Sequence, residues 1–464
     1  MVRITFKSIP EGAEIKRLYN VLRYVAVTDT ATERLSKISE ELLPLGSFTT
    51  ATTRSEFNTE IKKDRDLVFY FCHGLDGCLF DETDYCTIHP DSNLSDKILV
   101  LDACYSGITY SKEAVRSYGA IASLGYGAPL ACQLSGDGFK EGFKECFLNA
   151  QRILLNVNEI NKAVFIYAYH STRDLYNSWG DKYAADGDAM CAQLFYANAK
   201  NLLYYTKWDV ATTVDISISP LPAEIYHFGT YIGTAPLKAY GVMSGGNVFR
   251  YKAAGCYLTW LITNVPEAGE KYNLSPMQNH NKAVHKYADK SIYLEYNKEI
   301  VIPAPPATLE PFELVFYNYG DIEKENPTIT NDRGWVHGFL SDKLYPHKMN
   351  GNRCLVHITE SFEHRSEPYT EWIDFTVTLE EKTDTFSVPI RVMPSRGGRL
   401  AAESESLTAV IPPDILEQYY RVSARERREK KYAIGNRLYS LEEIIEEIRN
   451  GTEVGLIFIS TTQE

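Results

Sequence analysis

Apolar runs alternate with amphipathic stretches along the first 200 or so residues of the chain. The strongest apolar run is "LVFYFC" (67–72), and "KILVLDAC" (97–104) follows it with the same character. Further strand candidates lie at 21–29, 47–53 and 120–127, and residues with helical spacing lie between them at 30–43, 54–63 and 111–118. Strands that alternate with helices predict βαβ units and a mostly parallel sheet flanked by helices.

Helical patterns continue to about residue 205. We expect three helices there, over 135–156, 158–177 and 186–204, the first with Phe139, Phe143 and Phe147 four residues apart. In open parallel sheets, ligands bind at the carboxyl ends of the strands. Chemistry-bearing residues at the ends of the apolar runs are therefore the first candidates for a site.

The composition changes after residue 205, where Tyr, Thr, Val, Pro and Gly recur in short runs typical of antiparallel strands. The proline-rich stretch 302–311 and the stretch 394–407 are linker candidates. We therefore expect four parts: an α/β domain over 1–205, a β-rich accessory domain over 206–301, a β-sandwich-like domain over 302–400 and a C-terminal appendage over 401–464.

The appendage is expected to contain two helices and a strand. Residues 421–431 form a charged helical stretch, and 440–451 carry a capping-box pair, Ser440 and Glu443, before an apolar face of Ile444, Ile445 and Ile448 and a terminal Gly451. The final "GLIFIS" has the pattern of a strand. We expect this part to pack on the body of the protein.

Composition excludes some classes of protein. The 464 residues are 44% hydrophobic and 12% aromatic, which is enough to fill several cores. A net charge of −13 argues against a nucleic-acid partner bound by broad phosphate neutralisation. The N-terminus shows no signal peptide, and no apolar run has the length of a membrane span. Nine scattered cysteines do not form a disulfide pattern, so we expect a reducing, cytoplasmic location and no membrane partner.

The first apolar run ends on His73-Gly74 and the second on Cys104, followed by "YSG". A thiol nucleophile needs a base or a lowered pKa, donors for the developing oxyanion and a position that substrate can reach. A cysteine at the tip of a buried strand has that position. Gly74 allows the backbone to approach a substrate carbonyl closely. The pair is chemically sufficient for nucleophilic catalysis.

These two strand ends resemble those of the caspase-like (clan CD) cysteine peptidases, with His before Cys, 31 positions apart, most similar to the gingipain and CHAT peptidase branches. The resemblance covers roughly residues 20–205, and "YGAIASLGYGAP" after the cysteine is similar to the next strand of those branches. It implies a caspase-like α/β fold and cysteine endopeptidase activity on protein substrates. Cys104 would be the nucleophile, His73 the general acid/base, and the N–H groups of Gly74 and Cys104 the oxyanion hole.

The resemblance implies two further roles. Asp29 matches a position that orients the histidine in some relatives, although Thr28 and Thr30 are equally placed and an N-cap for the helix at 30–43 explains Asp29 as well. Asp102 matches a position that lines the pocket for arginine or lysine in clostripain-like and metacaspase-like enzymes. It predicts cleavage after basic residues, while a bond from its carboxyl to backbone N–H groups is an equal alternative.

Other readings stay open. Cys72, Cys78, Cys86 and His89 fall within 18 residues, so a zinc site is an alternative, although the spacing lacks paired C-x-x-C motifs. A calcium site from Asp76, Asp81, Glu82 and Asp84 is conceivable, but such a cluster is more typical of a solvated hairpin. We expect no metal and no cofactor.

The last alternative is a catalytically inactive scaffold that binds proteins. By analogy alone, the CHAT resemblance also suggests a prokaryotic immune or stress effector and an activating protein partner. If basic residues are preferred, "RVSARERREKK" (421–431) is a candidate self-processing or inhibitory segment, whereas a solvated charged helix is the plainer interpretation.

Overall fold

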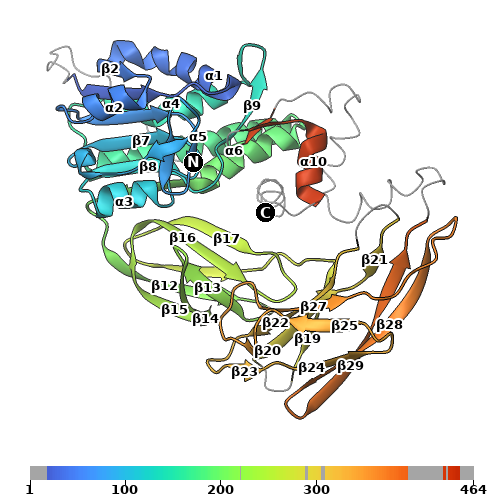
Figure 1. Cartoon of the computed structure of the whole chain (residues 1–464). Coiled ribbons are helices and arrows are strands. Elements are labelled where there is room, and N and C mark those ends of the chain that lie inside the picture. Colours follow the sequence, from blue (N-terminus) through green and yellow to red (C-terminus); the bar gives the residue numbers. More distant parts are fainter. Residues whose placement is uncertain are drawn as a thin grey trace.

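The computed structural model describes residues 18–219, 221–287, 291–304, 309–394, 432–434 and 437–449. They form an α/β unit, two β-rich units and a short C-terminal unit (Figure 1). None of the helices in these ranges combines the length and the apolar composition that crossing a membrane requires.

The α/β unit is built on a six-stranded sheet in the order β11-β8-β7-β3-β1-β2. Its strands are β1 (Asn20–Val25), β2 (Ser47–Ala51), β3 (Leu67–Phe71), β7 (Ile98–Asp102), β8 (Ala122–Tyr126) and β11 (Leu202–Thr206). The first five are parallel and only β11 is antiparallel. The prediction of a mostly parallel sheet is confirmed, whereas the helix predicted over 186–204 ends earlier, because pairing with β8 takes 202–206 into the sheet.

Helices cover both faces of this sheet, which is why β3 and β7 can be apolar at nearly every position. One face packs on α1 (Thr30–Ser39), α4 (Phe143–Leu155), α5 (Lys162–Ala185) and α6 (Ala189–Asn201). The opposite face packs on α2 (Arg54–Glu60) and α3 (Tyr110–Arg116), and on Val248 and Ile262 of the first β-rich unit. The sheet is therefore the middle of three layers.

The helix predicted to begin at residue 135 begins instead at Phe143. The preceding residues form a hairpin of β9 (Ala131–Ser135) and β10 (Gly138–Phe139). Gly136 and Gly142 have φ of +53° and +95°, conformations that a helix excludes and glycine accepts. Phe139 nevertheless stacks edge-on against Phe147 at 5.3 Å between ring centroids, so the predicted aromatic group exists without one continuous helix.

The polar segment between β3 and β7 folds into a small sheet of β4 (Gly74–Leu75), β5 (Cys78–Phe80) and β6 (Cys86–Ile88), followed by a 3₁₀ turn over Ser92–Leu94. A disulfide joins Cys78 to Cys86 across β5 and β6. The expectation of unpaired cysteines is wrong at this pair, because the hairpin brings two positions eight residues apart face to face. The other seven cysteines are buried and form no disulfide.

The first β-rich unit packs two sheets, β15-β12-β18 and β14-β13-β16-β17, around one apolar core. Its strands are β12 (Ala211–Ile218), β13 (Ala223–His227), β14 (Thr230–Ala235), β15 (Leu237–Met243), β16 (Gly245–Lys252), β17 (Thr259–Val265) and β18 (Glu270–Leu274). Figure 1 shows it directly below the α/β unit.

The second β-rich unit packs the sheets β19-β20-β22-β27-β25 and β21-β29-β28-β24 around its own core. The strands are β19 (Lys282–Lys286), β20 (Ile292–Asn297), β21 (Ile300–Ile302), β22 (Phe312–Asn318), β24 (Thr328–Asn331), β25 (Val336–Phe339), β27 (Asn352–His357), β28 (Tyr369–Leu379) and β29 (Lys382–Val392), with a separate pair of β23 (Lys324–Glu325) and β26 (Lys343–Leu344). Because β20 pairs with β22, this unit begins before the expected boundary at 302, which falls inside β21.

The C-terminal unit comprises β30 (Tyr432–Ile434), β31 (Arg437–Tyr439) and α10 (Leu441–Arg449). The predicted capping box is confirmed: the Ser440 N–H donates to Glu443 Oε2 at 2.8 Å, and the Glu443 N–H donates to Ser440 Oγ at 3.2 Å. Ile444 and Ile445 are buried in the core of the α/β unit. The side chain of Ile448, Gly451, the charged stretch 421–431 and the final apolar run lie outside the described residues.

Candidate active site

Three candidate residues follow three neighbouring parallel strands. Asp29 lies after β1, His73 after β3 and Cys104 after β7, and these strands are adjacent in the order β7-β3-β1. The register pairs Val25 with Phe71 and Phe71 with Asp102, so the carboxyl ends align at one edge. β2 and β3 pair on opposite sides of β1, which makes this edge a switch point where α/β proteins commonly bind ligands.

His73 and Cys104 line one small internal cavity. The cavity measures about 20 Å³ and is closed by side chains that include Leu130, Phe139 and Phe147. That volume holds about one water molecule. The structure therefore brings the two residues predicted from the strand ends to a common space, but in a conformation with no room for a peptide.

Cys104 lies at the start of a sharp turn that packs closely on β8. Tyr105, the next residue, has φ of +54°, which is uncommon for a residue other than glycine. Ser106 Oγ donates to the Ala103 carbonyl at 2.7 Å and accepts from the Tyr126 N–H at 3.2 Å. A Cβ on Gly107 would lie 2.9 Å from the backbone of Gly125 in β8, so only glycine fits there. The small residues after the cysteine are thus explained by close packing on β8.

The Cys104 sulfur accepts a hydrogen bond from the Leu130 N–H at 3.2 Å. A backbone donor at this position favours the thiolate, the reactive form of cysteine. Leu130 lies 26 positions away in sequence, in the loop between β8 and β9. The sequence analysis did not identify this donor, because a backbone N–H has no residue-type signal.

Asp29 serves both of the roles considered for it. Its Oδ1 accepts the Thr32 N–H at 2.8 Å and forms a capping box at the start of α1. Its Oδ2 lies 3.1 Å from His73 Nε2, an ion-pair distance, although the ring N–H is not aligned for a hydrogen bond. Burial alone would raise the pKa of the Asp29 carboxyl, but the contacts with His73 and the Thr32 N–H outweigh it and hold the pKa below its usual range.

Gly74 packs directly against the backbone of the cysteine. A Cβ at this position would lie 2.5 Å from the Cys104 carbonyl oxygen, a distance that no side chain tolerates. The backbones that follow β3 and β7 consequently approach each other more closely than any other residue would allow. This approach brings together the two residues whose N–H groups the resemblance assigns to an oxyanion hole.

Asp102 points into the protein and not toward solvent. Its carboxyl is buried and accepts a hydrogen bond from Gln151 Nε2 in α4 at 2.6 Å. Burial raises the pKa of this carboxyl well above its usual range, and the bond from Gln151 offsets only part of that effect. In this conformation the Asp102 carboxyl lies beside the Cys104 cavity and is not exposed to a basic side chain from solvent.

The β9–β10 hairpin covers the site. Leu130, Cys132 and Phe139, in or next to the hairpin, line the cavity, and only 4% of Cys104 and 5% of His73 are exposed. The Arg34 guanidinium of α1 donates to the carbonyls of Gly136 and Gly138 at the hairpin tip. The outer edge of β9 pairs with β30. The β9–β10 hairpin is therefore held by α1 at its tip and by β30 along the outer edge of β9.

The alternative metal sites do not form. Cys78 and Cys86 are bonded to each other, so they are not available as zinc ligands together with Cys72 and His89. Asp81 accepts bonds from Thr83, Tyr85 and Thr87 within its own hairpin. No group of three or more potential ligands gathers anywhere in the described ranges.

Comparisons with known proteins add little to this geometry. No family model matches the chain, and no curated protein matches it. Matching solved structures include the cadherin-like domains 1 to 4 of zebrafish RET (10% identity, 37% of this chain, 34% of that chain, TM-score 0.16) and domains 4–9 of the surface layer protein SbsC (14%, 42%, 28%, 0.17). A third is the beta-glucuronidase of Parabacteroides merdae (10%, 43%, 27%, 0.12).

The match spans about a third or less of each of these three structures. TM-scores this low carry no argument about fold or function.

Proposed function

We propose that the chain is a caspase-like cysteine endopeptidase with Cys104 as nucleophile and His73 as general acid/base. The observation that carries the proposal is the meeting of both residues in one cavity at the carboxyl ends of adjacent parallel strands. The carboxylate of Asp29 beside the ring and the N–H of Leu130 on the sulfur add the supports that such a pair requires. The His-before-Cys order on adjacent strands agrees with the resemblance to clan CD peptidases.

The reaction follows from these groups. The Cys104 thiolate attacks the scissile carbonyl carbon, and the carbonyl oxygen becomes an oxyanion held by the N–H groups of Gly74 and Cys104. The C–N bond breaks as the His73 imidazolium gives a proton to the leaving amine, which leaves a thioester on the sulfur. His73 then takes a proton from water, whose hydroxide attacks the thioester, and the thiolate is regenerated as the carboxylic acid product leaves. Asp29 stabilises the imidazolium and fixes the ring.

Preference for substrates with arginine or lysine before the cleaved bond depends on Asp102. Burial favours the neutral form of its carboxyl, and water or a cationic side chain that enters the cavity would favour the ionised form. Cleavage after basic residues thus requires the same opening that admits the substrate. Activity of wild type and Asp102→Asn on matched arginine and norleucine substrates tests this, and equal preference in both proteins would remove the assignment.

The described conformation is a closed one. A peptide needs the β9–β10 hairpin to move, and the C-terminal unit holds β9 in place through β30. The α10 side chains Leu441, Ile444 and Ile445 are buried in the same apolar cluster as Cys104 and Leu130. We therefore infer that the C-terminal unit keeps the enzyme latent until it is released by a partner or by cleavage.

A mixed peptide library tests the activity. Wild type, Cys104→Ala and His73→Ala are incubated with the library, with and without prior release of the C-terminal unit, and the products are read by mass spectrometry. Cuts that disappear in both variants would support the pair. No cuts by the released wild type, with Cys104 accessible to alkylation, would instead favour an inactive scaffold that binds proteins.

A further inference from the structure

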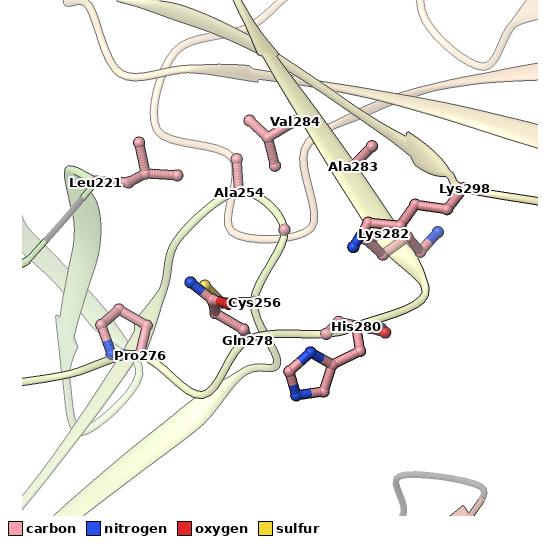
Figure 2. A pocket seen from close by; sticks show the side chains of 12 residues that line it. Leu221, Ala254, Cys256, Pro276, Gln278, His280, Lys282, Ala283, Val284 and Lys298 are labelled. Carbon is pink, nitrogen blue, oxygen red and sulfur yellow. The ribbon is translucent and has the colours of Figure 1, made fainter. Parts of the chain in front are cut away.

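A second cavity, larger than the one at Cys104, contains no part of the α/β unit. It measures about 380 Å³ and lies at the junction of the two β-rich units. Figure 2 shows Leu221 and Pro276 of the first unit on one side, and Lys282 and Lys298 of the second on the other. This volume falls in the range of small-molecule sites, which often occur at such junctions.

The lining of this cavity has one sign of charge. Its charged members are Lys282 and Lys298, and it contains no aspartate or glutamate, in a chain whose net charge is −13. His280 lies at the same rim (Figure 2). Lys298 forms no ion pair with any described residue, so its ammonium group is not neutralised by the part of the protein described. A positive rim on an acidic protein selects for anions.

A poorly exposed cluster of two lysines and one glutamate next to the cavity carries one excess positive charge. Glu295 lies 3.3 Å from the Lys252 ammonium and 3.8 Å from that of Lys282, and it accepts the Gly255 N–H at 2.6 Å. The exposed fractions of the three side chains are 6% for Glu295, 13% for Lys252 and 18% for Lys282. Two ammonium groups against one carboxylate leave one positive charge in a poorly solvated position, which is costly without a partner.

Of the two lysines, Lys282 is the one left with capacity to bind. Lys252 also donates to the Cys256 carbonyl and lies 5.4 Å from the centre of the Tyr317 ring. Lys282 makes no side-chain hydrogen bond to any described residue, and its contact with Glu295 is too long for one. An ammonium group has three donors. Lys282 therefore offers strong donors at the cavity wall.

The rest of the wall is apolar. It includes Leu221, Ala254, Cys256, Pro276 and Val284. Burial raises the pKa of the Cys256 thiol, which keeps it neutral and unreactive, so covalent capture of a ligand is not expected. A ligand that fits must place an apolar body here and a negative group at Lys282.

We propose that this cavity binds a small organic anion, with a single carboxylate or similar group paired to Lys282 and an apolar body against Leu221, Pro276 and Val284. The site is independent of the peptidase proposal, because it shares no residue with the Cys104 cavity. A ligand in it contacts both β-rich units and ties one to the other.

Two fluorescent probes separate charge from apolar contact on the full chain. Anilinonaphthalene sulfonate carries an anionic group on an apolar body, and N-phenyl-1-naphthylamine is its uncharged relative. Lys282→Gln is expected to weaken binding of the anionic probe about tenfold, the loss of roughly one charge-assisted contact, and to leave the neutral probe unchanged. Lys282→Arg should retain both.

The matched control is Lys238→Gln. Lys238 also forms a 3.8 Å ion pair, with Asp215, but its side chain is 54% exposed and outside the cavity. This variant should bind both probes as wild type does. Val284→Phe adds volume on the same strand face as Lys282, so it should narrow the cavity and lose both probes.

Unchanged binding of the anionic probe by Lys282→Gln, or of either probe by Val284→Phe, would overturn the proposal. A measurement without mutation adds to these variants: octanoate should displace the anionic probe from wild type much more strongly than octanol does. Equal displacement by the two compounds would overturn the assignment of a negative group at Lys282.

Discussion

Replacing Ile444 by alanine tests whether the C-terminal unit closes the site. Ile444 is completely buried in the core that also contains Cys104, Leu130 and Cys132. Isoleucine-to-alanine changes at such positions cost about 2–5 kcal/mol, because they remove buried methyl groups and leave a cavity. If α10 holds β30 on β9, the substitution destabilises the closed state of the β9–β10 cover relative to the open state. The population of the open state therefore rises.

The expected size of the effect follows directly. When the cover opens and closes faster than a reagent attacks, the rate of Cys104 alkylation is proportional to the open population. Each ~1.4 kcal/mol changes that population tenfold, so a loss of 2 kcal/mol predicts a rise of about 30-fold. Larger losses raise the rate until it reaches that of an exposed thiol.

The assay is timed alkylation with iodoacetamide, followed by digestion and mass spectrometry of each cysteine-containing peptide. Cys191, buried in α6 of the same unit, reports opening of the whole α/β unit. The control variant is Ile329→Ala, which removes the same atoms from an equally buried site in β24 of the second β-rich unit. It should leave Cys104 unchanged.

Two results would refute this reasoning. Ile444→Ala could remain folded and show the same Cys104 rate as wild type, in which case α10 does not support the cover. Alternatively, Cys104 and Cys191 could become faster by the same factor, which would show general loosening of the core. If Cys104 alone becomes reactive and yet no peptide is cleaved, the closure stands and the peptidase proposal fails.

Asp29→Asn should keep the N-cap of α1 but lower kcat/KM about 10- to 150-fold, because a charged contact with His73 of ~1.5–3 kcal/mol is lost. Asp91→Asn makes the same change at another N-cap and should leave kcat/KM unaltered. An equal loss in both variants would argue against a role of Asp29 in orienting His73. Gly74→Ala should abolish cleavage and lower the free energy of unfolding by about 1–3 kcal/mol, because its Cβ would lie 2.5 Å from the Cys104 carbonyl oxygen. The control is Gly338→Ala, whose Cβ would have no heavy atom within 4 Å. This variant should change neither the activity nor the thermal denaturation. Burial raises the pKa of Glu224 to about 7, so the folded state holds a proton that the unfolded chain releases near its ordinary pKa. Stability should therefore fall as pH rises from about 4.5 through 7, and Glu224→Gln should flatten that slope in denaturant titrations; an unchanged slope would contradict it.

The α/β unit was predictable where local pattern and tertiary structure agree. The runs at 67–72 and 97–104 became β3 and β7, because a strand covered on both faces must be apolar throughout. The pattern failed at β11 and at the β9–β10 hairpin. β11 depends on pairing with β8, and the spacing of the three phenylalanines suits a helix that Gly136 and Gly142 interrupt.

In the candidate site, too, some residues could be predicted from the sequence and others depend on tertiary structure. His73 and Cys104 could be found because parallel strands collect their carboxyl ends at one edge, whatever the sequence distance between them. Asp29 was ambiguous from sequence because one carboxylate has two oxygens: Oδ1 caps α1, and Oδ2 lies beside His73. The disulfide of Cys78 and Cys86 depends on the register of a hairpin, which the spacing of the two cysteines alone does not give.

The groups that form the candidate site and those that close it come from different kinds of segment. Residues at strand tips are held by a sheet with two covered faces, so their positions change little when other parts move. Phe139 and the strand β30 belong to a small separate sheet, β10-β9-β30-β31, in which β30 and β31 come from the C-terminal unit. Leu130 immediately precedes β9 in this sheet. Three residue pairs join β30 to β9, which is far fewer contacts than hold β3 between its neighbours. Because local opening begins where the fewest interactions must be broken, the cover should open before the strand tips are disturbed. If the proposed peptidase activity is correct, a closed cysteine on a rigid sheet edge, under a sheet joined by few residue pairs, predicts activation by release of the C-terminal unit and not by refolding.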